Sequence, residues 1–324
     1  MTRILVARLD KVGDTVLSTP FLHNLRRLYP QAVIIVLATP YNRDVLYHNP
    51  DVTEVVLEAK GPFDLAIALS PTTETYRAVA ATRAAERWGL VYASRWPARL
   101  MTSVWLTSTT VIDVDGPLKR GEPVMHEVRQ MLSILTSAGL AVEECPLQVH
   151  SNALQDAEAA AAFPGGLGIH FSVRWFTDGW GFAEFETLLG RLREAFPGET
   201  WLVTHGPAER EMAGRLQSQE GLVVAGERAF GTWAALIGRC RAYVSTDTGA
   251  LHVAAARQVP VAAVYEAATY EHCSQQWAPW MVPHEKVRKA GVEETAARVI
   301  ESLRGLAEGP GDGRQNLPAS NLTH

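Results

Sequence analysis

The segment from Arg241 to Tyr265, RAYVSTDTGALHVAAARQVPVAAVY, constrains the fold more than any other part of this sequence. Residues 242–245 and 261–265 are short runs of β-prone residues, and residues 250–258 between them are rich in helix formers. A strand, a crossover helix and a second strand of this length form one unit of a parallel sheet. The segment therefore predicts an α/β protein.

The first strand and the helix of this segment are joined by Thr246-Asp247-Thr248-Gly249. Asp247 or Thr248 can cap the helix, and Gly249 lets the backbone approach a ligand closely or adopt a left-handed conformation. Free N–H groups at such a helix start bind phosphate, at the carboxyl ends of the strands where open α/β sheets hold ligands. An ordinary capped crossover without a ligand explains the same residues, so both interpretations stay open for this segment alone.

The rest of the chain shows the same alternation in two series, one reaching about residue 150 and one starting near Gly166. The expected strands are residues 4–7, 33–38, 52–57 and 63–69 in the first series, and 167–171, 200–204, 222–225, 242–245 and 261–265 in the second. The expected helices are residues 15–29, 41–48, 182–196, 208–217, 250–258 and a closing helix at 292–306. Residues 309–324 have too little apolar content to pack, which predicts a loose tail.

The composition of the chain limits which classes of protein it can belong to. With 324 residues, 47% of them hydrophobic, the chain can bury the cores of two domains. Its net charge of −5 argues against a dedicated nucleic-acid binder. Cys145, Cys240 and Cys273 are widely spaced and lack metal-ligand spacing, which is typical of reduced thiols. Since no apolar run approaches the length of a membrane span, we expect a soluble, cytoplasmic protein.

Two motifs lie near opposite ends of the chain. Residues 8–30, RLDKVGDTVLSTPFLHNLRRLYP, contain an Arg after a strand, a Gly-Asp pair, a Thr-Pro, and a helix ending in Tyr-Pro. Residues 244–265, VSTDTGALHVAAARQVPVAAVY, contain Asp-Thr-Gly before a His and a helix of small residues. These motifs resemble the opening motif and the donor motif of glycosyltransferase family 9, the ADP-heptose:lipopolysaccharide heptosyltransferases, and residues 87–90 and 170–180 match the family more weakly.

The resemblance implies a GT-B fold, in which two Rossmann-like domains face each other across a cleft. We therefore expect residues 1–155 to form the acceptor domain and residues 156–290 the domain that holds the nucleotide-sugar. The helix at 291–308 is expected to pack back toward the first domain, as is common in the family, and residues 309–324 form the tail.

The resemblance also implies an inverting transfer of heptose from ADP-heptose to a sugar hydroxyl of the lipopolysaccharide inner core or a related glycan. It implies no required metal and no other cofactor. The expected partners are a nucleotide-sugar donor and an anionic glycan or glycolipid acceptor, with peripheral contact at the inner membrane face as a further interpretation. A family member with another donor or a small-molecule acceptor, and a degenerate module that binds without turnover, are the alternatives.

Such a transfer needs a general base for the acceptor hydroxyl, and Asp14 matches the family residue proposed for this role. It follows the first strand, on the side expected to face the donor domain. The alternative is an Asp that caps the helix expected from Thr15, and both roles can hold together.

The leaving nucleotide diphosphate needs fixed donors, and the resemblance assigns donor binding to a larger set of residues. Asp247 is expected to position its loop or bind a sugar hydroxyl, because a carboxylate repels phosphate. Two positions depart from the family: Asp178 stands where a phosphate-binding Lys is usual, and Glu266 where Gly is frequent. An Arg fork at Arg174 could replace that Lys. The expected donor residues are Gly13, Ser172, Arg174, Glu209, Asp247, Thr248, Gly249 and His252. A first-turn Glu favoured by the helix dipole is the alternative for Glu209, and a packed or capping histidine is the alternative for His252.

Residues 77–105 suggest where an acceptor binds, because they interleave five Arg with aromatic residues and contain one acidic residue. Such a surface suits an anionic saccharide or membrane headgroups. A solvated helix face with core aromatics is the alternative. The expected acceptor residues are Arg87, Arg95 and Arg99, extended by Lys119 and Arg120.

Overall fold

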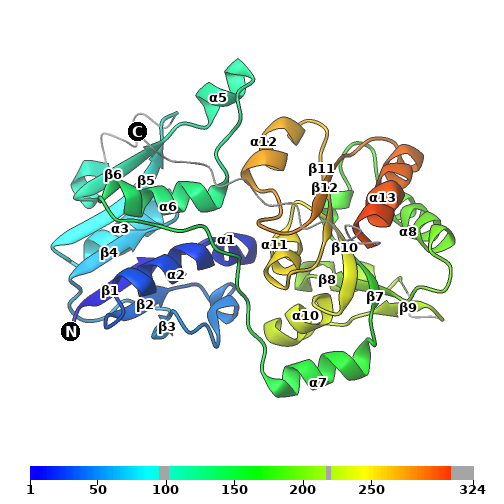
Figure 1. The fold of residues 1–324 in the computed structure, drawn as a ribbon, viewed down its shortest axis with the longest axis horizontal. Helices are drawn as coiled ribbons and strands as arrows, with labels where there is room; N and C mark the ends of the chain where they lie inside the picture. Colours follow the sequence, from blue (N-terminus) through cyan, green and yellow to red (C-terminus); the bar gives the residue numbers. More distant parts are fainter. Residues whose placement is uncertain (95–101, 217–219, 308–324) are drawn as a thin grey trace.

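The computed structural model describes residues 1–94, 102–216 and 220–307, and it confirms the α/β class. Two parallel six-stranded sheets lie side by side, each with helices on both faces (Figure 1). The elements of the first domain are β1 (Arg3–Ala7), α1 (Val12–Leu17), α2 (Thr19–Leu28), β2 (Val33–Leu37), η1 (Arg43–Leu46), β3 (Glu54–Val56), β4 (Leu65–Ala68), α3 (Thr73–Ala81), β5 (Glu86–Tyr92), β6 (Ser108–Ile112), α5 (Asp115–Arg120) and α6 (Glu127–Ser137). Those of the second are α7 (Ala153–Ala162), β7 (Gly166–Phe171), η2 (Val173–Trp175), α8 (Phe182–Ala195), β8 (Trp201–His205), η3 (Pro207–Glu209), α9 (Arg210–Ala213), β9 (Leu222–Val224), α10 (Phe230–Ile237), β10 (Cys240–Thr246), α11 (Gly249–Ala256), β11 (Val261–Tyr265), α12 (Tyr270–Gln276), β12 (His284–Arg288) and α13 (Val292–Ala307).

The two sheets have equivalent strand orders. The first is β3-β2-β1-β4-β5-β6, the second is β12-β11-β10-β7-β8-β9, and all neighbouring strands are parallel. The direction of winding therefore reverses between β1 and β4 in one sheet and between β7 and β10 in the other. Open α/β sheets bind ligands in the crevice at the carboxyl ends of the strands where this reversal occurs.

The β10–α11–β11 unit has the predicted order of strand, helix and strand, but the helix expected at residues 15–29 differs. It begins at Val12 and is divided into α1 and α2. Pro20 has no N–H to offer the Val16 carbonyl, and the hydroxyl of Thr19 donates to that carbonyl at 2.8 Å instead. The earlier start places the loop residues before Thr15 inside the first turn of a helix.

Two other expected helices are shorter in the structure. Residues 41–48 contain only the 3-10 turn η1, which is followed at His48 by a left-handed backbone conformation with φ of 62°. Residues 208–217 contain η3 and the four-residue α9, and residue 217 lies outside the described part of the chain. The expected tail at 309–324 also lies outside it.

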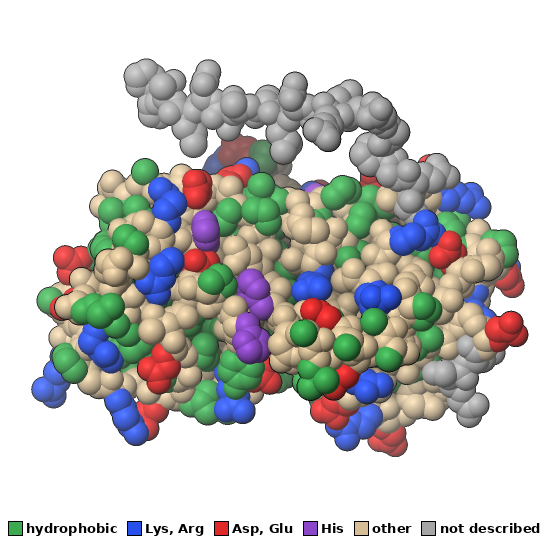
Figure 2. All heavy atoms as spheres, turned by 60° about the horizontal axis from the view of Figure 1, so that its bottom comes forward, with side chains coloured by type: hydrophobic (Ala, Val, Ile, Leu, Met, Phe, Trp, Pro, Cys, Tyr) green, Lys and Arg blue, Asp and Glu red, His purple; other side chains and the backbone are tan. Residues whose placement is uncertain are grey.

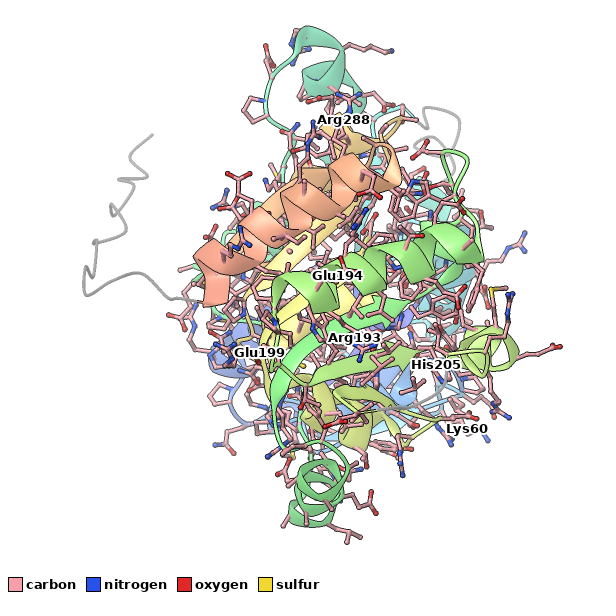
Figure 3. All side chains as sticks on the ribbon, turned by 90° about the vertical axis from the view of Figure 1, so that its right-hand side faces the viewer. Lys60, Arg193, Glu194, Glu199, His205 and Arg288 are labelled. Carbon is pink, nitrogen blue, oxygen red and sulfur yellow. The ribbon has the colours of Figure 1, made fainter. Side chains whose placement is uncertain are left out.

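The closing helix corrects one expectation about the domains. Helix α13 was expected to pack back toward the first domain, but it lies beside α8 and covers strands β10 to β12 of the second sheet (Figure 3). The cause is its apolar face, because Ala296, Val299 and Leu303 are buried in the core of the second domain. An ion pair of 3.1 Å between Arg191 of α8 and Glu293 adds to this contact. None of the helices in the described ranges is both long and apolar enough to cross a membrane.

The expected boundary at residues 155 and 156 falls inside α7, which packs on α10 of the second domain. Apolar packing does not stop at this boundary. One cluster of buried side chains contains Leu17 and Leu25 of the first domain together with Leu251 and Tyr265 of the second. The interface between the domains is therefore partly an apolar core.

Polar contacts join the domains at a second place, which we name the inter-domain seam: residues 124–127 before and at the start of α6, and residues 275–280 at and after the end of α12. The Val124 N–H donates to Gln275 Oε1 at 2.9 Å, and His126 Nε2 donates to the Ala278 carbonyl at 3.0 Å. The His126 ring also lies 4.5 Å, centroid to centroid, from that of Trp280.

The seam should weaken in acid because of His126. Burial lowers the pKa of His126 to about 4 in the folded protein, whereas an unfolded chain has a histidine pKa of about 6.5. The unfolded chain then binds the extra proton, so this contribution to stability is complete above pH 6.5 and is lost as pH falls toward 4. From pH 6.5 to 5 the loss amounts to about 2 kcal/mol of the free energy of unfolding.

Urea unfolding at pH 7 and pH 5 tests this expectation. In His126→Asn the N-cap of α6 keeps a hydrogen-bond acceptor, but the side chain no longer binds a proton in this pH range. The difference in stability between the two pH values should therefore shrink. The control is His48→Asn, an exposed histidine in a conformation that Asn tolerates. Equal pH dependence in both variants would show that His126 does not carry this effect.

Candidate active site

The site is organised by two helix starts that touch where the domains meet, α1 from the first domain and α11 from the second (Figure 1). A Cβ atom on Gly13 would lie 3.0 Å from Cδ2 of His252 and 3.1 Å from the Cα of Gly249, and one on Gly249 would lie 3.2 Å from the Gly13 nitrogen. Both approaches are tighter than ordinary side-chain contacts. Glycine at both positions therefore allows this contact.

The polar residues of the site lie at the carboxyl ends of the strands where each sheet reverses. In the second sheet, Ser172 follows β7 and Thr246 ends β10, and their buried hydroxyl oxygens are 3.1 Å apart. In the first sheet, Ser70 follows β4, and its hydroxyl donates to the carboxylate of Asp10 after β1. Both ligand-binding crevices of the fold therefore open toward the contact of α1 with α11.

Asp14 lies in the first turn of α1, which is the predicted side of the first domain. Its Oδ2 accepts from the Lys11 N–H at 3.2 Å, so it serves the helix start as a capping residue. Its side chain nevertheless remains 31% exposed. Burial raises the pKa of Asp14, an effect partly offset by Arg8, whose Nη2 lies 3.6 Å from Oδ1. A reachable carboxylate with raised proton affinity can act as a base.

Asp247 approaches Asp14 from the second domain. Burial raises the pKa of Asp247 to about 6, Arg174 opposes the increase, and the negative charge of Asp14 adds to it. The negative charge of Asp14 therefore acts on Asp247 although the two residues belong to different domains.

A cavity of about 140 Å³ lies beside Asp247, at the carboxyl ends of β10, β11 and β12. Two cations and two carboxylates line it. Arg174 Nη1 is 3.5 Å from Glu266 Oε1, and Lys289 Nζ donates to the carbonyls of Trp175 and Thr177 at 2.7 and 2.6 Å. With the charges balanced in this way, the cavity offers both hydrogen-bond donors and acceptors.

The start of α11 can receive an anion. Thr248 is its N-cap residue, but no side chain of the described residues caps the helix, and the Thr248 hydroxyl lies 3.1 Å from that of Ser245. The first N–H groups of α11 therefore stay available for a negatively charged group. His252, one turn further on, is buried, and burial lowers its pKa to about 3, so its ring is neutral.

Glu209 lies apart from this group, in η3 after β8. It is buried, and its Oε1 is 3.5 Å from the N–H of Val173, the residue that begins η2. An open pocket of about 490 Å³ lies nearby at the ends of β8 and β9, lined by residues that include His205 and Arg210. Glu209 and this pocket thus lie along the same sheet as Asp247, and their part in donor binding stays a prediction.

Among the described residues, the expected acceptor residue Arg87 lies away from Asp14. Arg87 lies at the amino end of β5, the opposite edge of the sheet from Asp14, and its guanidinium donates to the carbonyls of Trp105 and Ala84 at 2.7 and 2.6 Å. Arg87 therefore lies outside the site, because a parallel sheet binds ligands at the carboxyl ends of its strands. Basic and acidic side chains are interspersed on the face shown in Figure 2.

Of the other expected acceptor residues, Arg95 and Arg99 lie outside the described ranges. Lys119 and Arg120 lie in the last turn of α5, and Arg120 forms an exposed ion pair with Glu122 at 2.7 Å.

Three residues of the site were given no role from the sequence. Arg8 was noted only as the Arg that follows the first strand in the opening motif. Glu127 begins α6 and Lys289 follows β12, and no local pattern distinguishes either of them. Among the described residues, no group of three or more His, Cys, Asp or Glu is placed to hold a metal ion.

Comparison with known proteins relates these features to a family. The family model described as glycosyltransferase family 9 (heptosyltransferase) matches residues 62–305. A comparison with curated proteins found no significant match. Among solved structures, a family 9 glycosyl transferase from Veillonella parvula is 19% identical, covering 95% of this chain and 98% of its own, with a TM-score of 0.77.

Two Escherichia coli structures are also similar. The ADP-heptose lipopolysaccharide heptosyltransferase II is 19% identical over 95% of this chain and 99% of its own, with a TM-score of 0.72. The heptosyltransferase WaaC with ADP is 17% identical over 94% and 99%, with a TM-score of 0.68. These similarities establish the GT-B fold, and the family match covers most of the chain: the protein belongs to glycosyltransferase family 9 and is a glycosyltransferase.

Proposed function

We propose that this protein is an inverting glycosyltransferase that moves heptose from ADP-heptose to a sugar hydroxyl of the lipopolysaccharide inner core or a related glycan. The observation that carries the proposal is the contact of α1 with α11, which sets the carboxylate of Asp14 opposite the uncapped start of α11. A base and an anion site on facing domains are what a transfer between two bound sugars requires.

The reaction is a single displacement. The acceptor hydroxyl gives its proton to the Asp14 carboxylate as its oxygen forms a bond to the anomeric carbon. The bond from that carbon to the diphosphate breaks, and its electron pair leaves with the ADP. Attack opposite the leaving group inverts the anomeric centre. The N–H groups of α11 after Thr248 and the guanidinium of Arg174 stabilise the charge that develops on the diphosphate.

The cavity beside Asp247 suits the sugar of the donor. Its carboxylates, Asp247 and Glu266, can accept hydrogen bonds from sugar hydroxyls, while Arg174 and Lys289 keep the lining close to neutral overall. Glu209 and the pocket beyond β8 are then left for the nucleoside. An acceptor that is part of a membrane glycolipid would bring this cytoplasmic enzyme to the inner membrane face.

One observation favours a different nucleotide-sugar as second candidate. Asp178, which stands where the resemblance expects Lys, has a left-handed backbone with φ of 54° and is followed by Gly179 with φ of 82°. Asp is among the residues that tolerate this conformation. The resulting turn presents a carboxylate rather than an ammonium group near the donor, which would alter the donor preference.

Replacing Asp14 separates an enzyme from a binding module. We expect Asp14→Asn to lower turnover by about 10² to 10⁴-fold, because a general base contributes this much. Affinity for ADP should stay within a few-fold, since the second domain holds the donor. Asn can still cap α1 in place of the carboxylate, so stability should change little. Near-normal turnover in this variant would leave Asp14 as a helix cap alone.

Donor binding should not need a divalent metal. ADP and ADP-heptose are expected to raise the melting temperature equally with and without a chelator, and other nucleotide-sugars to raise it less. Product mass measured with the same donors identifies the sugar transferred. If stabilisation disappeared in chelator and returned with magnesium, metal-independent binding would be refuted.

Arg174 is the expected substitute for the absent Lys. We expect Arg174→Ala to weaken ADP binding, measured by calorimetry, by about tenfold or more, as for the loss of a hydrogen bond to a charged group. Arg191→Ala is the control, because this Arg of similar exposure pairs with Glu293 far from the cavity. An unchanged affinity in Arg174→Ala would mean that Arg174 serves only its ion pair with Glu266.

A further inference from the structure

Arg8 is a buried cation shared by carboxylates. Its side chain is 1% exposed, its Nε donates to the Asp14 carbonyl at 3.1 Å, and its Nη1 donates to the Leu69 carbonyl at 2.8 Å. These bonds fix the guanidinium between β1, β4 and α1. Its Nη2 then faces two carboxylates, 3.6 Å from Asp14 Oδ1 and 3.7 Å from Glu127 Oε1. Both distances are longer than a hydrogen bond, so neither carboxylate is bonded to Nη2. Asp14 and Glu127 are instead attracted to the same positive charge.

Glu127 connects this cation to the second domain. It is buried at the start of α6, and while its Oε1 faces Arg8, its Oε2 accepts from Gln276 Nε2 at 2.8 Å across the inter-domain seam. Gln276 ends α12 and is held within its own helix, because His272 Nε2 lies 2.6 Å from its Oε1. The bond to Glu127 is therefore present only while α12 is docked against α6.

We propose that Glu127 is a positioning residue that couples the docking of α12 on the first domain, through Arg8, to the strength of Asp14 as a base. The inference rests on the proposed function, in which Asp14 takes the proton of the acceptor.

The coupling follows from charge. The bond from Gln276 favours ionised Glu127, and a second negative charge beside Arg8 makes Asp14 hold a proton more strongly. Where the bond from Gln276 is lost while Glu127 stays buried, Glu127 binds a proton more readily and leaves Arg8 to Asp14. Burial raises the pKa of Glu127 and of Asp14, and Arg8 lowers both, so the balance responds to one hydrogen bond.

The groups that face Glu127 are few. Arg8, Asp14 and Asp10 act on it by charge from the first domain, and Gln276 acts by its hydrogen bond from the second. The hydroxyl of Tyr92, also in the first domain, lies 3.3 Å from Gln276 Nε2. The effect of α12 on this group therefore passes through the amide of Gln276. Asp14 is accordingly the strongest base when the two domains are docked for transfer.

Titration of Asp14 tests the coupling without requiring turnover. With 13C-labelled aspartate, the Asp14 resonance is identified by its absence in Asp14→Asn. In Glu127→Gln we expect the pKa of Asp14, and with it the acid limb of the pH profile of kcat/KM, to move down by about one unit. The maximal rate should fall about threefold, since a weaker base accepts the proton less readily.

A matched pair of variants separates the coupling from loss of the seam. Gln276→Leu removes the bond to Glu127. It should also lower the pKa of Asp14, but by less than Glu127→Gln does. Gln275→Leu removes the neighbouring bond of the seam, to the Val124 N–H, and should leave the Asp14 titration unchanged. If Glu127→Gln fails to fold, the comparison of Gln276→Leu with Gln275→Leu still tests whether the bond to Glu127 affects Asp14.

The proposal would be overturned if the pKa of Asp14 did not change in Gln276→Leu, or if it changed equally in Gln275→Leu. A parent without transferase activity would refute the proposed function instead, and the resonance of Asp14 would still report whether Glu127 acts on it.

Discussion

Gly13 and Gly249 lie against each other at the starts of two helices, and the rest of the site depends on this contact. A side chain on either residue would push the domains apart by pressing on the backbone or on His252. Because the contact is made at the carboxyl ends of both sheets, it aligns two crevices that the topology has already created. The same fold with a wider junction would have the same residues but no shared site.

Burial then decides the chemistry of the charged groups. His252 is neutral because burial lowers its pKa to about 3, whereas Asp247 keeps its proton to about pH 6 for the same reason. Arg8 stays charged within the first domain because carboxylates surround it. The site thus combines groups of raised proton affinity with a neutral ring, and in the proposed function the backbone at α11 and the guanidinium of Arg174 bind the diphosphate.

The features readable from the sequence were the local ones. Hydrophobic alternation predicted both α/β series, and the Asp247–Gly249 turn predicted a helix start at the end of a strand. Asp14 was expected on the loop after β1, and the structure places it in the first turn of α1 instead. Its role as a base stays a prediction. The misplacement of Arg87 has a physical cause: composition shows that arginines are clustered, but only strand direction shows that Arg87 lies at the amino end. Glu127 and Gln276 are 149 residues apart, and their bond depends on the docking of the domains, so no local pattern could reveal it.

The apolar cluster that runs from Leu17 to Tyr265 through the domain junction has a consequence for how the molecule unfolds. Separating the domains completely would expose buried side chains of both, so the free energy of each sheet includes part of the other. The stabilities of the two domains are therefore coupled, and we expect a substitution that loosens the first sheet to lower the stability of the second sheet as well.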